Sequence, residues 1–362
     1  MNAAAKNYDG VNKYIRITDI DEASSTYTDN DIVSPDGVLT DNYLVNNRDI
    51  LLARTGASTG KSYLYKKSDG KLYYAGFLIR ANVTTHDPYF VFSQLHTHRY
   101  WRWVSIMSAR SGQPGINSHE YSSFPIYTTS IEEESKIAKL LSLLDERIAT
   151  QNKIIEDLKK LKSAIINYAI NSLDTDFAKF SSLYEMAGEG GTPTTSNASF
   201  YDNGKIPFIK IDDLKQKYLT ENKDFITELG LQKSSAWLVP THSILFSNGA
   251  TIGEISITTY PVCTKQGILG IVPKQNIDVE FLYYFMSSSY FKKAVSRIVT
   301  EGTMKTAYLK DINNILCPIP TKEKQQEIAK MPSALNSKID FEQSILKLFC
   351  SQKQYLLRQM FI

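Results

Sequence analysis

Residues 56–62 (Gly-Ala-Ser-Thr-Gly-Lys-Ser) have the composition of a loop that could bind phosphate. A nucleotide-binding P-loop needs four residues between its glycines, so that successive backbone N–H groups surround the phosphates, and it leads into a helix. Here three residues separate Gly56 from Gly60, and residues 62–65 (Ser-Tyr-Leu-Tyr) predict a strand. The segment is therefore interpreted as a glycine-rich turn whose glycines serve backbone geometry.

Three further groups resemble catalytic or metal-binding motifs, and each lacks a necessary part. Residues 87–90 (Asp-Pro-Tyr-Phe) have one proline fewer than the Asp-Pro-Pro-Tyr motif of adenine methyltransferases and fit a helix N-terminus better. His96 and His98 stand two positions apart on a predicted helix, where their side chains diverge by about 200°. Glu134 and Lys136 have nuclease-like chemistry but lie on a long predicted helix. The sequence therefore predicts no catalytic residue and no metal site.

Polar donors in predicted turns, together with basic residues, form the pattern expected of a nucleic-acid surface. Lys and Arg neutralise phosphates, and Gln, Asn and Thr side chains can read base edges. Basic and aromatic residues also alternate at 99–103 and 290–293, although those aromatic side chains fit a protein core equally well. The residues predicted to contact nucleic acid are Arg54, Thr55, Lys61, Arg110, Gln113, Asn248, Lys265, Gln266, Thr303 and Lys305.

These residues belong to a chain of 362 residues, a length that suggests two or three domains. The net charge of 41 − 38 = +3 excludes a histone-like polycation and leaves nucleic-acid binding to local patches. The three cysteines (Cys263, Cys317 and Cys350) fit no zinc-site spacing and indicate a reducing, cytoplasmic setting. No apolar run approaches the roughly 18 residues of a membrane helix, so membrane association is not expected.

The sequence contains two copies of one pattern, about 190 residues apart. Residues 15–20 (Ile-Arg-Ile-Thr-Asp-Ile) match 209–214 (Ile-Lys-Ile-Asp-Asp-Leu), and residues 51–60 match 244–253. Three further matches follow in the same order, at 100–102 and 290–292, at 124–126 and 317–319, and at 137–139 and 328–330. Two copies are too few for a solenoid, so the chain is interpreted as a pseudo-two-fold repeat of a domain-sized unit.

Each copy begins with short β-like runs broken by turn dipeptides and continues with a helix, expected at 88–107 and 279–299. Asp87 and Asp278 are placed to cap these helices.

Each copy ends in a long predicted helix with one apolar face. No Pro or Gly occurs between Ser130 and Tyr168, and apolar residues recur every three or four positions. The counterpart begins near Thr321, and Pro332 predicts a kink or a later start. The two helices would cover their apolar faces by pairing, in antiparallel fashion if a pseudo-dyad relates the copies. The residues expected in this coiled coil are Ile137, Leu144, Leu158, Ile165, Ile328, Leu335, Ile345 and Phe349.

The predicted fold is α+β, with two similar α/β domains separated by two long antiparallel helices that form a coiled coil. The domains are expected at 1–128 and 173–320, and the helices at 129–172 and 321–362. Three functions remain open from the residues alone: a DNA-recognition scaffold, a coiled-coil protein–protein adaptor without DNA contact, and a stand-alone adenine methyltransferase or ATP-dependent enzyme.

The whole chain resembles the DNA-specificity (S) subunits of type I restriction–modification systems. The resemblance rests on Gly-Thr-Pro at 191–193 followed by 206–214, on Gly-Ala-Thr-Ile-Gly at 249–253 with its variant at 56–60, and on the passage 318–329. The N-terminal copy departs from the family pattern, because it has no counterpart of the Gly-Thr-Pro segment.

The resemblance implies a non-catalytic chain whose two target-recognition domains each read half of a split site in double-stranded DNA. It also implies that the two helices set the gap between the half-sites and bind two methyltransferase (M) subunits, with restriction (R) subunits joining for cleavage. S-adenosylmethionine, ATP and Mg would then belong to the partner subunits, and this chain would bind no cofactor directly.

Overall fold

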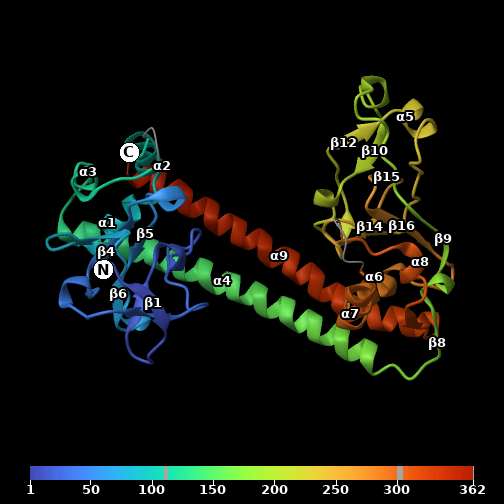
Figure 1. The fold of residues 1–362 in the computed structure, drawn as a ribbon, viewed down its shortest axis with the longest axis horizontal. Helices are drawn as coiled ribbons and strands as arrows, with labels where there is room; N and C mark the ends of the chain where they lie inside the picture. The colour runs from blue at the N-terminus through green and yellow to red at the C-terminus, as the bar shows by residue number, and fades with distance from the viewer. Residues whose placement is uncertain (110–112, 300–304, 362) are drawn as a thin grey trace. The chain divides into compact units, whose positions relative to one another are not determined.

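The computed structural model describes residues 1–109, 113–299 and 305–361 (Figure 1). The chain divides into two compact units, unit 1 with Met1–Ile154 and Glu342–Ile362, and unit 2 with Ile155–Phe341. Each unit combines an α/β body with parts of two long helices. These helices are α4 (Ile131–Asn171) and α9 (Lys322–Met360), 41 and 39 residues long.

The body of unit 1 is built around β4, whose five residues are all buried. Strand β4 is central in an antiparallel sheet of order β5-β4-β7. Its Ile50 and Leu52 face a cluster formed with α1 and α2, while Leu51 and Ala53 face a second cluster on the other side. A strand buried on both faces is expected to be apolar, as residues 50–53 of β4 are, while the buried Asp49 at its start accepts a hydrogen bond from the N–H of Asn46 at 2.7 Å. The strands are β1 (Ala4–Asn7), β2 (Lys13–Ile15), β3 (Val33–Asp36), β4 (Asp49–Ala53), β5 (Ser62–Leu64), β6 (Leu72–Tyr74) and β7 (Leu78–Asn82). The shorter helices are α1 (Pro88–Gln94), α2 (His98–Met107) and α3 (Ser118–Ser122).

The body of unit 2 repeats this plan around β13 and adds strands to it. Strand β13 lies between β14 and β16 in a sheet of order β11-β14-β13-β16-β9, and a smaller sheet has the order β12-β10-β15. The strands are β8 (Phe177–Lys179), β9 (Tyr184–Glu189), β10 (Ile206–Ile209), β11 (Tyr218–Leu219), β12 (Asp224–Ile226), β13 (Ile244–Ser247), β14 (Ile255–Thr258), β15 (Cys263–Thr264), β16 (Ile268–Pro273) and β17 (Leu316–Pro318). The shorter helices are α5 (Glu228–Gln232), α6 (Val279–Ser287), α7 (Ser289–Ile298) and α8 (Leu309–Ile312).

The repeat extends to single hydrogen bonds. The N–H of Arg16 donates to Asp19 Oδ2 at 2.8 Å, and that of Lys210 donates to Asp213 Oδ2 at 2.9 Å. Strands β2 and β6 pair in parallel, as do β10 and β15. The predicted α+β fold with an internal repeat is therefore confirmed.

The single helices expected at 88–107 and 279–299 are each two helices. Asp87 and Asp278 cap α1 and α6 as predicted. A second cap follows in each unit, where Thr97 Oγ1 accepts from the N–H of Tyr100 at 3.2 Å and Ser288 Oγ accepts from that of Phe291 at 3.3 Å. Because a hydroxyl at an N-cap stabilises a new helix start, the chain turns at these points and the prediction of one continuous helix is wrong.

The long helices pair antiparallel in the part of each unit where both occur. In unit 1, Asp145 forms an ion pair with Lys353 at 2.6 Å, and Gln151 donates to the carbonyl of Glu342 at 3.1 Å. In unit 2, Lys162 donates to Asn336 at 2.9 Å, and Ile166 and Ile170 share an apolar cluster with Ala329. In these contacts the residue number increases along α4 while that of its partner decreases along α9, as antiparallel pairing requires.

Helix α9 continues through Pro332, so the expectation of a later start is wrong. Among the residues predicted for the coiled coil, Leu144 is buried and the other seven are half-buried. Some more deeply buried positions are Ala138, Leu141 and Leu357, which share an apolar cluster with Phe90 of α1, so this part of the helix pair also packs against the body of unit 1. In the described ranges no helix, α4 and α9 included, combines the length and the apolar character needed to span a bilayer.

His96 makes the stability of unit 1 sensitive to pH. Burial, with a smaller contribution from Lys353, lowers the pKa of His96 to about 4, and its Nε2 lies 3.0 Å from Ser25 Oγ. Since an unfolded His titrates near about 6.5, the unfolded state binds more protons between pH 6.5 and 4, and stability falls as the pH falls through this range. Between pH 7 and pH 5 the free energy of unfolding should decrease by about 2 kcal/mol less in His96→Gln than in the unsubstituted protein. Urea unfolding at the two pH values measures this difference. Parallel pH profiles of the two proteins would contradict a neutral, half-buried His96 imidazole.

Candidate nucleic-acid interface

In unit 1 the loop that joins β4 to β5, residues 54–61, is bonded to residues 113–116. The N–H of Ile116 donates to the carbonyl of Arg54 at 2.9 Å. A Cβ placed on Gly56 would lie 3.3 Å from Gln113 Nε2, so the Gln113 amide rests against the glycine. The structure therefore brings Arg54, Thr55 and Gln113 together at the end of β4.

Two buried tyrosines fix the shape of this loop. The Tyr121 hydroxyl donates to the carbonyl of Ala53 at 2.6 Å and accepts from the N–H of Gly60 at 3.1 Å. The Tyr100 hydroxyl donates to the carbonyl of Gly60 at 2.8 Å. Burial raises the pKa of Tyr121 to about 12 and raises the pKa of Tyr100, so both phenols keep the protons they donate. Gly60 has φ +94°, and a Cβ there would lie 2.7 Å from Val104, so the loop requires glycine at this position.

The equivalent loop in unit 2, residues 248–254, joins β13 to β14. The N–H of Ala307 donates to the carbonyl of Asn248 at 2.9 Å. A Cβ on Gly249 would lie 3.3 Å from Gly267 Cα, which places the β15–β16 turn beside the loop. Lys265 and Gln266 are exposed on that turn, and Lys305 is exposed in the segment that leads to Ala307.

Matching hydrogen bonds show which positions in the two loops correspond. The N–H of Ala53 donates to Lys61 O, and the N–H of Ser247 donates to Glu254 O, each at 2.9 Å. Arg54 therefore corresponds to Asn248. The sequence match of 51–60 with 244–253 pairs Ala53 with Phe246, whereas the hydrogen bonds equate Ala53 with Ser247. The difference of one residue arises because the loop of unit 1 contains one residue more.

The predicted contact residues differ in how they are placed. Arg54 is exposed and forms no ion pair with any described residue. Lys61 is largely covered, with 18% of its side chain exposed, and pairs with Glu22 at 3.2 Å. Asn248 is 1% exposed, and its Nδ2 donates to Ala307 O at 3.2 Å, so it holds the loop in place and does not face solvent. Two other predicted contacts, Arg110 and Thr303, lie outside the described residues.

The alternation of basic and aromatic residues at 99–103 has a structural explanation. The Arg99 guanidinium lies 4.2 Å from the ring centre of Tyr127 and donates to the carbonyl of Pro125 at 2.7 Å. Tyr100 is fully buried. In unit 2, the Tyr290 hydroxyl donates to the carbonyl of Leu316 at 3.0 Å in the corresponding place. Arg99 and Tyr100 therefore stabilise the body of unit 1, whereas Trp101 in the same segment is exposed.

The groups considered for metal chemistry do not converge. His96 is bonded to Ser25, whereas His98 is exposed at the start of α2. In the described ranges no three His, Cys, Asp or Glu side chains are grouped so as to hold a metal ion. Glu134 is fully buried, and its carboxylate accepts from the N–H of Asp87 at 2.9 Å, so it joins α4 to the start of α1.

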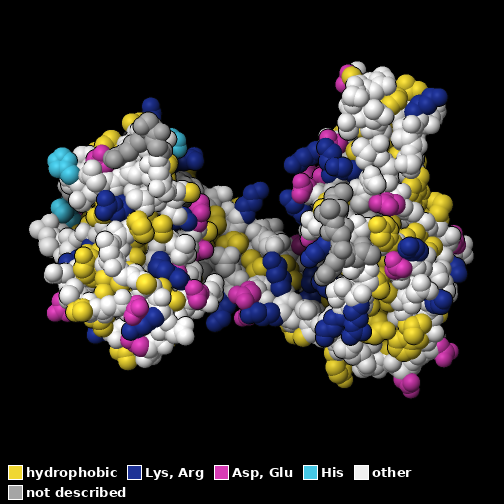
Figure 2. Space-filling model, in the orientation of Figure 1, with side chains coloured by type: hydrophobic (Ala, Val, Ile, Leu, Met, Phe, Trp, Pro, Cys, Tyr) yellow, Lys and Arg dark blue, Asp and Glu magenta, His cyan; other side chains and the backbone are white. Residues whose placement is uncertain are grey.

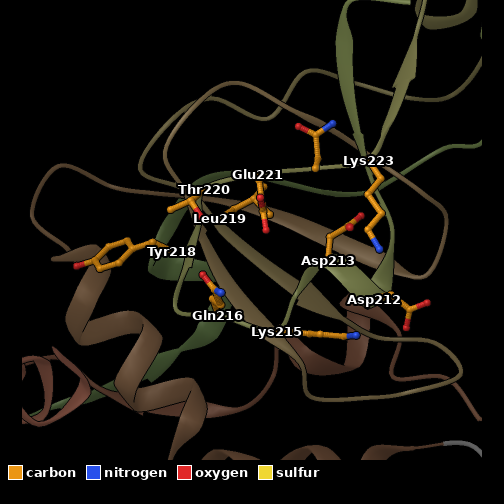
Figure 3. A pocket seen from close by; sticks show the side chains of 10 residues that line it. Asp212, Asp213, Lys215, Gln216, Tyr218, Leu219, Thr220, Glu221 and Lys223 are labelled. Carbon is orange, nitrogen blue, oxygen red and sulfur yellow. The ribbon is translucent and has the colours of Figure 1, made fainter. Parts of the chain in front are cut away.

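A shallow pocket in unit 2 is lined by no residue of the loop 248–254 (Figure 3). One continuous stretch, residues 212–223, lines it, and Asp212, Asp213 and Glu221 lie there among Lys215 and Lys223. The lining contains no His or Cys and no residue predicted to contact nucleic acid. Opposite charges in one shallow depression do not define an anion site.

Basic and acidic side chains are interspersed on the face drawn in Figure 2. Neither body presents a uniformly basic surface on that face (Figure 2). Contact with a polyanion would therefore depend on a few positioned cations.

The chain belongs to the family described as Type I restriction modification DNA specificity domain, which matches residues 1–160 and 175–348. The two matched segments correspond to the two copies of the repeat. The resemblance inferred from the sequence is confirmed.

Curated relatives agree with this assignment, and a solved structure shows the same fold. The MjaIX specificity subunit of Methanocaldococcus jannaschii is 32% identical over 173 residues, which are 46% of this chain and 39% of the relative. The putative MjaX specificity subunit of the same organism is 25% identical over 285 residues, 73% of this chain and 65% of the relative. The alignments thus span less than two thirds of either relative. The crystal structure of the S subunit from M. genitalium has the same fold, with a TM-score of 0.61 at 17% identity over 98% of this chain and 89% of that one.

Asn248 and Arg54 occupy equivalent backbone positions, and their substitution should separate structural from surface roles. Asn248→Ala removes a buried hydrogen bond and should lower the free energy of unfolding by about 1–2 kcal/mol. Arg54→Ala removes an exposed side chain and should change it by less than about 0.5 kcal/mol. Chemical denaturation of both variants measures this difference. Equal effects would contradict the placement of the two side chains.

Proposed function

We propose that this chain is the DNA-recognition subunit of a type I restriction–modification complex and that each unit reads one half of a bipartite target. The observation that carries this proposal is the pair of glycine loops at β4 and β13. Their backbones are held by equivalent hydrogen bonds, while the side chains they present differ. One scaffold with two sets of exposed donors is suited to reading two different short sequences.

The exposed side chains around the loops have the chemistry for this task. In unit 1, Arg54 can pair with a phosphate or with guanine, and the Gln113 amide can pair with adenine. In unit 2, Lys265 and Lys305 can contact phosphates, and Gln266 can read a base edge. Asn248 is excluded from direct readout in the described conformation because it is buried.

Catalysis is assigned to partner proteins. We infer that two M subunits bind the α4–α9 coiled coil and that R subunits join the assembly for cleavage. S-adenosylmethionine would be bound by M, and ATP and Mg by R, while this chain contributes recognition in the cytoplasm, where the DNA is. The relatives named as specificity subunits support this division of labour.

A coiled-coil adaptor without DNA contact is the alternative that the mixed surface charge favours. The two functions differ in one measurable property. A DNA-binding subunit releases counterions when it binds, so its retention on DNA falls steeply with salt, whereas an adaptor shows no such retention.

Arg54→Ala should weaken DNA binding by the complex of this chain with its M subunits, if the side chain contacts a phosphate. The slope of log K against log salt should become shallower by about 0.9, the value for one lost phosphate contact. Fluorescence anisotropy over a salt series measures both quantities. Lys66→Ala is the matched control, because Lys66 is exposed at the opposite end of β5 from the loop. An unchanged slope for Arg54→Ala would remove this residue from the interface.

Gln113→Ala and Gln266→Ala should relax specificity in different halves of the target. Each loses a base contact worth about 1–3 kcal/mol, so each should tolerate wrong bases at one position while the other half-site stays unchanged. Sequencing of methylated DNA from cells that carry the complete system reads both halves at once, and each variant serves as the control for the other. Relaxation of the same half-site by both variants would contradict the assignment of one half to each unit.

A further inference from the structure

The long helices of the two units correspond residue by residue. Glu134 of α4 and Gln325 of α9 accept from the N–H groups of Asp87 and Asp278 in the same way. A residue of α4 therefore corresponds to the residue of α9 that is numbered 325 − 134 = 191 higher. The same difference separates Asp87 from Asp278, so the contacts that the helices make in the two units can be compared one by one.

One pair of equivalent contacts differs in charge. In unit 1, Asp145 forms an ion pair with Lys353 at 2.6 Å. The equivalent residues in unit 2 are Asn336 and Lys162, and the Lys162 Nζ donates to Asn336 Oδ1 at 2.9 Å. An amide oxygen carries no formal charge, so the half-buried Lys162 is hydrogen-bonded to this partner but is not neutralised by it.

Two exposed lysines lie near Lys162 and add to the positive charge. Lys159 precedes it by three residues and lies on the same face of α4. Lys292 lies on α7, whose first residue, Ser289, donates its N–H to Asn167 of α4 at 2.8 Å. Neither Lys159 nor Lys292 forms an ion pair with a residue in the described ranges.

The charges of these lysines act on one another. Burial lowers the pKa of Lys162, and the nearby Asp340 raises it. The charges of Lys159 and Lys292 lower the pKa of Lys162 further. Lys217 has the same effect, although it is itself in an ion pair with the glutamate of α6 at 2.8 Å. The ammonium groups therefore repel one another, and an anion bound among them would relieve this repulsion.

The corresponding positions in unit 1 do not carry this charge. Lys159 corresponds to Cys350 and Lys292 to Trp101, because the N-caps of α2 and α7 also differ by 191. We refer to Lys159, Lys162 and Lys292 as the lysine cluster. Unit 1 builds the same arrangement of helices without it, so the fold does not require the cluster.

Helix α7 joins the lysine cluster to the surface proposed to contact DNA. The helix carries Lys292 and ends at Ile298. The segment that follows contains the exposed Lys305 and Ala307, whose N–H holds the recognition loop at the carbonyl of Asn248. On the face drawn in Figure 2, Lys and Arg side chains gather over the part of unit 2 where Figure 1 places α7. Lys ammonium groups are common phosphate ligands, so a phosphate of the DNA is the anion that suits this position.

We propose that Lys159, Lys162 and Lys292 bind a phosphate of the DNA backbone outside the bases that unit 2 reads. The phosphate takes, beside Lys162, the place that the Asp145 carboxylate has beside Lys353. The cluster contributes affinity and no sequence information, since the backbone is the same in every sequence. This inference rests on the proposed function and adds to it a contact made by one of the two units.

Lys159→Ala combined with Lys292→Ala tests the cluster in the complex of this chain with its M subunits. Both residues are exposed, so folding should be unaffected, and each lost phosphate contact should make the slope of log K against log salt shallower by about 0.9. Binding should weaken equally on target and unrelated DNA, and the methylated sequence should stay the same. Lys293→Ala is the matched control and should leave the slope unchanged, because Lys293 is exposed on the same helix but points about 100° away from Lys292.

The outcomes separate this inference from the proposed function. An unchanged slope in the double variant, together with salt-dependent binding by the unsubstituted complex, would overturn the phosphate contact alone. Release of M subunits from the double variant at an unchanged slope would assign the cluster to a protein contact and would also overturn the proposal. Absence of DNA binding by the unsubstituted complex would overturn the proposed function, and this inference with it.

Asn336→Asp introduces in unit 2 the carboxylate that Asp145 supplies in unit 1. The new charge should pair with Lys162, so DNA binding should weaken and the salt slope should become shallower by about 0.9. Asn336→Ala is the matched control, because it removes the same hydrogen bond without adding a charge, and it should leave the slope unchanged. Fluorescence anisotropy over a salt series measures both variants, and equal slopes would overturn the proposal.

Discussion

The attachment of each long helix to its α/β body depends on a buried polar side chain at the start of the helix. In unit 1 the carboxylate of Glu134 is fully buried and accepts from the N–H of Asp87 at 2.9 Å and from that of Thr129 at 3.3 Å. In unit 2 the amide of Gln325 accepts from the N–H of Asp278 at 2.8 Å. A buried polar group is costly unless it is bonded, so these bonds fix the start of the long helix against the first helix of each body.

Each body in turn separates a constant backbone from variable side chains. Tyr100 and Tyr121 hold the loop of unit 1, whereas in unit 2 Ser247 Oγ accepts from the N–H of Glu254 at 2.8 Å to hold the same turn. Different groups thus hold two loops that leave and re-enter their sheets through equivalent backbone hydrogen bonds. Because the geometry is secured from inside the body, the exposed positions around it can change without loss of the fold, which is the property a recognition surface requires.

Much of the architecture could be predicted from the sequence, because it follows from local signals repeated twice. Asp87 and Asp278 cap helices as their spacing indicates, and the long runs without Pro or Gly are helical. The breaks that divide each predicted helix into two could not be predicted in this way, because they depend on tertiary context. Thr97 and Ser288 are compatible with a helix interior, yet their hydroxyls begin new helices.

The candidate site could be predicted only in part. The glycines identified the loops, and the structure does bring Arg54, Thr55 and Gln113 together. The burial of Asn248 could not be read from the sequence, because it depends on a carbonyl contributed by Ala307, far along the chain. The same is true of Glu134. In the sequence it stands near Lys136 in a nuclease-like pair, and only its burial in the structure shows its structural role.

The contact between Gln151 and Glu342 constrains how the paired helices can change. Both side chains are 7% exposed, and the amide of Gln151 donates to the carbonyl and the carboxylate of Glu342. Sliding one helix along the other would break these buried hydrogen bonds between the Gln151 amide and Glu342, which is costly for buried polar groups. This buried contact therefore favours one alignment of the two helices along each other in unit 1.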